Sequence, residues 1–190
     1  SGTDIEATLR ALVEHPEFDS AVGQKVRTPS EDLIATYRVL GVRATKPTGR
    51  TSDLSDTIIW QANSMGLQPF EWPTPDGPPD VNDAWTSVSR MLGSWQQHRN
   101  LAGGWWPATA VDFRSKRSFL PRLPARFDEI VDHVCRELHA RPATDELVAA
   151  ACAAVGVRRW ERITEDHRVV EWQVPNLLRA LLDTPRHMSR

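Results

Sequence analysis

The amino-acid sequence predicts an all-α fold, an irregular helical bundle of about seven or eight helices with one long loop rich in proline and tryptophan. Three observations predict it. Apolar residues recur at the three- and four-residue spacing of an amphipathic helix through most of the chain. Glycine or proline follows most of these periodic segments, as helix ends require. No segment sustains apolar–polar alternation between hairpin turn signals, so a sheet is not expected.

The apolar periodicity and the helix-stopping residues place the elements in order. Ile5, Leu9, Leu12 and Val13 form one apolar stripe, and Pro16 ends it. Pro124 occupies a favourable first-turn position for a later helix, because proline lacks only an N–H that would be unpaired there. The expected helices cover residues 5–13, 30–40, 54–65, 83–101, 124–140, 144–155, 165–172 and 174–182, with a short turn at 16–22.

Composition limits the class of protein. The chain has 190 residues, of which 40% are hydrophobic and 25% charged, as in an ordered globular protein. We expect one helical domain over residues 1–190, with two candidate sub-lobes at 1–112 and 123–190. A formal net charge of −2 gives no long-range attraction for nucleic acid, so a nucleic-acid partner is not expected. No apolar run reaches the roughly 20 residues that cross a bilayer, so no membrane span is expected.

The N-terminus and the cysteines bear on the origin of the chain. It begins Ser1-Gly2-Thr3-Asp4, without an initiating methionine or the pattern of a signal peptide. We therefore expect it to be the C-terminal portion of a longer protein. Cys135 and Cys152 both lie in apolar helical patterns, and two buried thiols favour a reducing, cytoplasmic compartment. Export is compatible with the same sequence, because targeting information would lie in the missing part.

Residues 67–82 form the most distinctive segment. Five of them are proline, which lacks an N–H and disfavours helix in its predecessor, so an irregular loop is expected. Tryptophans gather along and beyond it, and the candidate ligand-binding residues among them are Trp72, Trp85, Trp105 and Trp106. Exposed indole rings stack on sugars, prolines or cations. The structural alternative is that Trp85 anchors its helix while Trp72 pins the loop to the core.

Carboxylates in the same region are weaker candidates for a metal site. Asp76, Asp80 and Asp83 offer the oxygen ligands that hard cations such as calcium prefer. Their spacing does not match an EF-hand, and Asp83 could instead cap the helix that follows. A pair of these carboxylates could also serve hydrolytic acid–base chemistry. The sequence holds no glycine-rich phosphate loop, no nucleophile elbow and no Cys-x-x-Cys, so the cofactor is unknown.

Two motif regions carry a family resemblance. Lys25-Val26-Arg27-Thr28-Pro29-Ser30-Glu31 precedes Tyr37-Arg38-Val39-Leu40-Gly41, and Met65-Gly66-Leu67-Gln68-Pro69-Phe70-Glu71-Trp72-Pro73 runs on through Asp76-Gly77 to Ala84-Trp85 and Arg90. These segments resemble the C-terminal region of the large bacterial family called domain of unknown function 1800. The resemblance covers nearly the whole chain, although Pro78 stands where the family pattern has an aromatic residue. It implies a helical fold and a bacterial source, but no established reaction.

Arg27, Glu31 and Arg38 match the family pattern. Glu31 and Arg38 are seven residues apart, so they lie on one face of a helix two turns apart, and Arg27 precedes that helix. One interpretation is a structural ion-pair network. The alternative is that Arg27 and Arg38 bind an anion together.

Three functions are compatible with these patterns. The first is a helical module that binds a partner protein or a polysaccharide through the loop rich in tryptophan and proline. The partner could be the missing N-terminal region of the same protein. The second is the C-terminal half of an enzyme, hydrolytic or metal-dependent, whose catalytic residues lie mostly in that missing region. The third is a purely structural domain.

Overall fold

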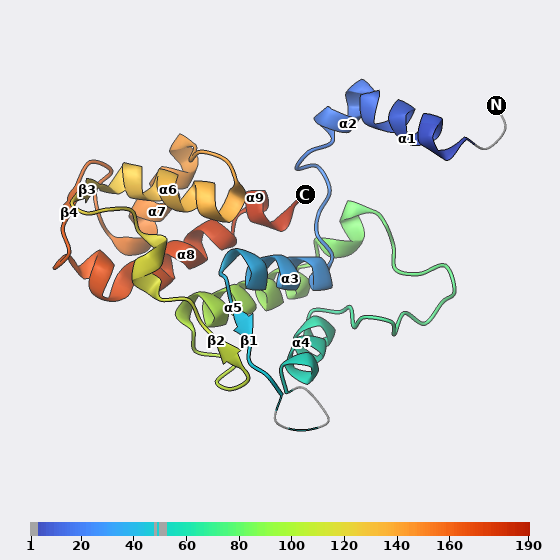
Figure 1. Cartoon of the computed structure of the whole chain (residues 1–190), viewed down its shortest axis with the longest axis horizontal. Helices are drawn as coiled ribbons and strands as arrows, with labels where there is room; N and C mark the ends of the chain where they lie inside the picture. The colour runs from blue at the N-terminus through green and yellow to red at the C-terminus, as the bar shows by residue number, and fades with distance from the viewer. Residues whose placement is uncertain (1–3, 48, 50–52) are drawn as a thin grey trace.

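Two central helices organise the fold. The computed structural model describes residues 4–47, 49 and 53–190, and it packs α5 (Val88–Gly103) against α8 (Val174–Leu182). The helix α3 (Pro29–Val39) contacts α5, and α4 (Asp53–Ser64) contacts α3. The helices α6 (Phe127–His139), α7 (Asp145–Val155) and α9 (Pro185–Met188) pack around α8 in the C-terminal half (Figure 1).

The interior of the bundle is lined by one face of α8. Val174, Leu177, Leu178, Leu181 and Leu182 recur at the spacing of an amphipathic helix, and each has 1% or less of its surface exposed. They belong to a cluster of buried residues that extends from Leu33 to Leu182. The periodicity seen in the sequence therefore marks the buried face of α8. Removal of this apolar face from water stabilises the packing of α8 in the bundle.

The prediction of an all-α fold is confirmed. In the part of the chain that the structure describes, strands are limited to two antiparallel ladders and an isolated bridge between Val26 and Ser189. The strand β1 (Arg43–Ala44) pairs with β2 (Val111–Asp112), and β3 (Ala125–Arg126) pairs with β4 (Arg162–Ile163). These pairs hold loops together rather than forming a layer. No described helix is long and apolar enough to cross a membrane.

The long helix in the middle of the chain starts later than the sequence predicts. Instead of one helix from residue 83, a 3-10 turn, η1 (Asn82–Trp85), is followed by a break, and α5 begins at Val88. Ser87 is extended and its hydroxyl accepts from the Arg90 N–H at 3.3 Å, so the serine supplies the N-cap. Asp83 makes no side-chain cap, because the turn that it enters is not the start of α5.

Two C-terminal segments also differ from expectation. The helix α6 begins at Phe127 rather than Pro124, because Ala125 and Arg126 pair with β4. The helix expected at 165–172 is present only in its second half: residues 165–167 form a turn, and a π-helical turn, η3 (Val169–Gln173), then leads directly into α8. Pro175 lacks the N–H for a regular helical bond, and the wider π turn accommodates that loss.

The N-terminal helices α1 (Ile5–Glu14) and α2 (Pro16–Ser20) form an arm that projects from the rest of the molecule (Figure 1). Neither helix has a buried residue. The apolar stripe predicted from Ile5, Leu9, Leu12 and Val13 is therefore present but exposed. A second 3-10 turn, η2 (Lys116–Phe119), lies in the connection between α5 and α6.

Candidate functional site

The long proline-rich segment brings two of the four candidate tryptophans together. The rings of Trp72 and Trp85 meet edge to face, with 6.3 Å between their centroids. Trp85 is buried, and its indole N–H donates to the carbonyl of Pro79 at 2.9 Å. Trp72 is half-buried, and its indole N–H donates to the Thr74 hydroxyl at 3.0 Å. Trp85 is thus buried in the turn, while part of the Trp72 ring stays accessible.

These two rings line a pocket of about 390 Å³, which we name the aromatic pocket. It lies where the proline-rich segment, the end of α4 and the start of α5 meet. Its other polar side chains are small or amide-bearing, apart from one arginine. The lining residues besides Trp72 and Trp85 are Asn63, Ser64, Met65, Gly66, Pro79, Ala84, Ser87, Ser89 and Arg90. No carboxylate belongs to this lining in the described part of the chain, so the pocket offers no acid–base pair.

Arg90 forms the innermost polar part of the aromatic pocket. Only 3% of its surface is exposed, and burial lowers the pKa of its guanidinium while Asp32 opposes that shift. Its Nη2 donates to the carbonyl of Arg27 at 2.8 Å and lies 3.4 Å from the Asp32 carboxylate. Its Nε is buried and has no hydrogen-bond partner among the described residues. Arg90 therefore connects the pocket to the charged groups behind it.

Trp105 and Trp106 do not line the aromatic pocket. The rings of Trp60 and Trp106 meet edge to face, with 5.5 Å between their centroids. Trp105 is exposed, and the Arg99 guanidinium lies 5.3 Å from the centre of its ring. These two tryptophans thus belong to a different surface from Trp72 and Trp85.

The acidic candidates do not converge either. Asp80 pairs with Lys25, Asp76 accepts from the Thr74 hydroxyl, and Asp83 is exposed. Across residues 4–47, 49 and 53–190, the grouping of potential metal ligands does not include any of these three aspartates.

Arg27 and Arg38 differ in burial and in their contacts. Arg27 is half-buried, and its Nε donates to the carbonyl of Ser189 at 3.2 Å. Arg38 is exposed on α3, while the Glu31 carboxylate pairs with Arg190 at 2.9 Å. Glu31 also accepts from the Thr28 N–H at 2.9 Å as half of a capping box, so its partners in the described chain do not include Arg38.

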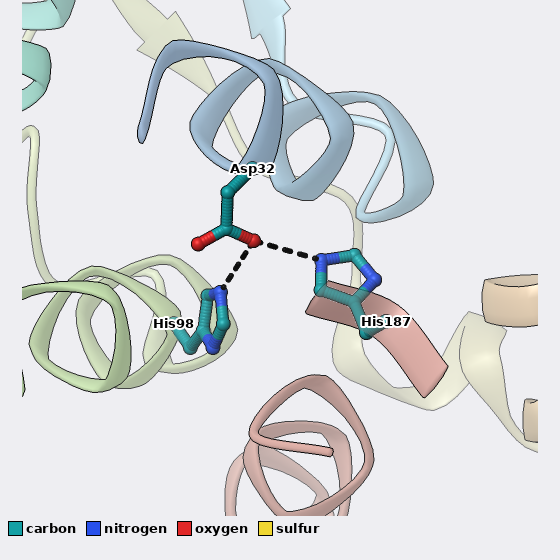
Figure 2. Close-up of side chains that lie close together, drawn as sticks. All are labelled: Asp32, His98 and His187. Atoms are coloured by element: carbon teal, nitrogen blue, oxygen red, sulfur yellow. Dashed lines mark hydrogen bonds and ion pairs between the residues drawn. The ribbon is translucent and has the colours of Figure 1, made fainter. Parts of the chain in front are cut away.

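Behind Arg90 lies a group of side chains that the sequence did not single out. Asp32 on α3, His98 on α5 and His187 on α9 point toward one another, and Figure 2 shows the carboxylate between the two rings. We name these three residues the Asp–His cluster. The Asp32 Oδ1 lies 3.3 Å from the His98 Nε2 and 3.8 Å from the His187 Nε2. All three residues have 2% or less of their surface exposed.

Further polar groups surround the Asp–His cluster. The Nδ1 of His98 lies 2.9 Å from the Asp183 carboxylate, so two carboxylates flank one imidazole. The His187 Nε2 lies 2.9 Å from the Thr36 hydroxyl, and that hydroxyl donates to the Asp32 carbonyl at 2.8 Å. The cluster is thus an extended buried hydrogen-bond network, in which every lost partner would leave a desolvated group.

Burial and the neighbouring polar groups shift the pKa in opposite directions at Asp32 and His98, and in the same direction at His187. Burial would raise the pKa of Asp32, but hydrogen bonding and charge from His98, together with Arg90, lower that pKa to about 2. Burial lowers the pKa of His98, yet the two flanking carboxylates outweigh burial and the pKa is raised. Burial and the charge of His98 lower the pKa of His187 to about 3. The network therefore favours the ionised form of Asp32, the protonated form of His98 and the neutral form of His187.

One signal in the sequence could have pointed to this network. Arg90, Ser94, Gln97 and Leu101 recur along α5 at helical spacing, and all four are buried. Three polar residues on the buried face of a helix need partners in the interior, because unpaired polar groups are costly there. The partners themselves come from distant segments. The spacing of polar residues on α5 therefore indicates a buried polar site but does not identify the other residues in it.

A second pocket, of about 360 Å³, opens on the opposite end of the network. His139 and His187 line it, together with basic side chains that include Arg27, Arg141 and Arg186. The rings of His139 and His187 are 6.1 Å apart between centroids. His187 is therefore the member of the Asp–His cluster that lies next to a solvent-connected space.

Comparison with known proteins identifies the family without adding a reaction. No curated protein and no solved structure matches the chain. The family model described as a protein of unknown function, DUF1800, matches residues 1–189, which is essentially the whole sequence. The resemblance drawn from the sequence motifs is confirmed, and the chain belongs to the DUF1800 family of proteins of unknown function.

Proposed function

We propose that this chain is a saccharide-binding module and that the aromatic pocket is its binding site. The observation that carries the proposal is the convergence of Trp72, Trp85 and Arg90 on one concave space. A volume of about 390 Å³ lies within the range of small-molecule sites, which are roughly 300–1,000 Å³. Such sites combine an aromatic wall with a few polar groups, and this lining has both.

The chemistry of the lining favours a sugar over a purely apolar ligand. A pyranose ring offers C–H groups to an indole face and hydroxyls to amide and hydroxyl side chains. Trp72 supplies the accessible indole, while Asn63, Ser64 and Ser89 supply the small polar groups. Binding rather than hydrolysis is proposed because the described lining holds no carboxylate pair for acid–base chemistry.

The test is titration of the protein with neutral and acidic oligosaccharides, followed by calorimetry and ligand-observed NMR. Trp72→Ala should lower the affinity by about two- to tenfold, since an aromatic contact contributes on the order of 0.5–1.5 kcal/mol beyond the area that it buries. Trp172→Ala is the matched control, because Trp172 is 59% exposed and lies outside the aromatic pocket. Equal affinities for the native protein and Trp72→Ala, or no binding of any oligosaccharide, would contradict the proposal.

A further inference from the structure

The ligand atoms of the Asp–His cluster have the spacing of a metal site. The Asp32 Oδ1 is 3.3 Å from one imidazole nitrogen and 3.8 Å from the other, and all three ligand atoms lie within 4.8 Å of one another. Zinc binds nitrogen and oxygen ligands at about 2.0–2.2 Å in a tetrahedron, which separates the ligand atoms by roughly 3.3–3.6 Å. An ion can therefore be placed between these atoms with small side-chain movements.

The side chain of His98 is held in the orientation that a metal ligand needs. Its Nδ1 lies 2.9 Å from Asp183, and Asp183 is itself held by the Nε of Arg179 at 3.2 Å. In metal sites, a ligating histidine commonly donates its second ring N–H to a carboxylate, which fixes the ring and raises its basicity. Asp183 stands in this supporting position, so the Nε2 of His98 is directed at Asp32.

The charges around Asp32 are compatible with a metal ion in place of the Nε2 proton of His98. Because Nδ1 of His98 donates to Asp183, its Nε2 would present a lone pair to the Asp32 oxygen unless a positive charge lies between them. A proton can supply that charge, and so can a metal ion. Arg90 contacts the other carboxylate oxygen, Oδ2, and leaves Oδ1 available as a single-oxygen ligand.

We propose that Asp32, His98 and His187 bind a divalent transition-metal ion of the zinc class. Two histidines and one carboxylate are three protein ligands, which leaves a fourth position for water or substrate. On binding, His98 releases the proton of its Nε2 to solvent, and the single ring proton of neutral His187 moves from Nε2 to Nδ1, so that both Nε2 lone pairs face the ion.

The experiment is titration of the chelator-treated full chain with Zn²⁺ by calorimetry and with Co²⁺ by visible absorption. One ion per chain and the intense visible bands of low-coordinate cobalt are expected. His187→Gln keeps a donor for Thr36 but removes the imidazole ligand, and it should abolish stoichiometric binding. Asp183→Asn keeps the ligands but weakens the support of His98, so the affinity should fall about 10–100-fold.

His15→Ala is the control, because His15 lies between α1 and α2 on the exposed arm and outside the cluster. Circular dichroism of each variant distinguishes the loss of a metal-binding side chain from the loss of the folded structure. Two results would overturn the proposal: no stoichiometric uptake of either ion by the native chain, or the same affinity in His187→Gln as in His15→Ala. Detection of His98 with protons on both nitrogens at saturating Zn²⁺, by nitrogen-15 NMR, would overturn it as well. None of these outcomes depends on whether the aromatic pocket binds sugars.

Discussion

The aromatic pocket and the Asp–His cluster lie on either side of Arg90, yet they are built in different ways. The pocket takes Trp72 from an extended proline-rich segment and leaves that ring half-buried. The cluster takes one side chain from each of α3, α5 and α9, and its members are almost completely buried (Figure 2). One region thus offers surface to a ligand, and the other holds ionised groups away from water.

This difference separates the effects that substitutions should have. A half-buried ring on a loop contributes little to the packed interior, so its removal should change binding more than stability. A buried ionised group is tied to its partners, so its removal should change stability first. Substitutions in the two regions therefore test whether ligand affinity and the free energy of unfolding change independently. A substitution of Arg90 tests whether the two regions are coupled.

The largest effect is expected for Asp32→Ala. The substitution leaves Arg90 and His98 buried without their shared anion, and breaking a buried ion pair costs on the order of 3–5 kcal/mol. Urea denaturation in the presence of a chelator measures this loss without any contribution from metal. Asp80→Ala is the comparison, since Asp80 pairs with Lys25 at the surface and should show almost no change. Similar losses for both variants would mean that the buried network is no more important for stability than a surface pair.

A smaller effect is expected for Arg90→Met, which keeps most of the side-chain volume. Asp32 loses one cation but keeps His98, so stability should fall by about 2 kcal/mol, as for loss of a hydrogen bond to a charged group. The aromatic pocket loses its innermost polar group at the same time, so saccharide affinity should fall as well. Denaturation and calorimetry on the same sample measure both. A change in one property alone would show that Arg90 does not couple the two regions.

The sequence predicted the secondary structure well because most of these helices carry their own signals. The stripe on α8 and the capping box that begins α3 are local patterns, and both helices lie where they were expected. The errors arose where a nearby segment competed with the local pattern. Ser87 replaced Asp83 as the helix cap, and pairing with β4 kept Ala125 and Arg126 out of α6.

The two parts of the site differ in how far the sequence could reveal them. Trp72 and Trp85 are close in sequence and share an unusual composition, so their proximity could be anticipated. Asp32 and His98 are 66 residues apart, and Thr36 and His187 are 151 apart. Such pairs come into contact only in the folded bundle, so neither their residue types nor their spacing in the sequence predicts the contact. The polar face of α5 was the one local signal for the cluster.

The smallest effect is expected for Arg38→Ala, which tests the predicted pairing of Arg27 with Arg38. Arg38 is exposed, and its side chain makes no hydrogen bond or ion pair to the described residues, so stability should change by no more than about 0.5 kcal/mol. Arg27→Ala should cost more, because it removes the bond that holds Ser189 beside the start of α3. Thermal unfolding with and without inorganic phosphate measures both variants. If phosphate stabilises the native chain but neither single variant, the two arginines act as one anion site. If Arg38→Ala behaves like the native chain, Arg38 has no part in such a site.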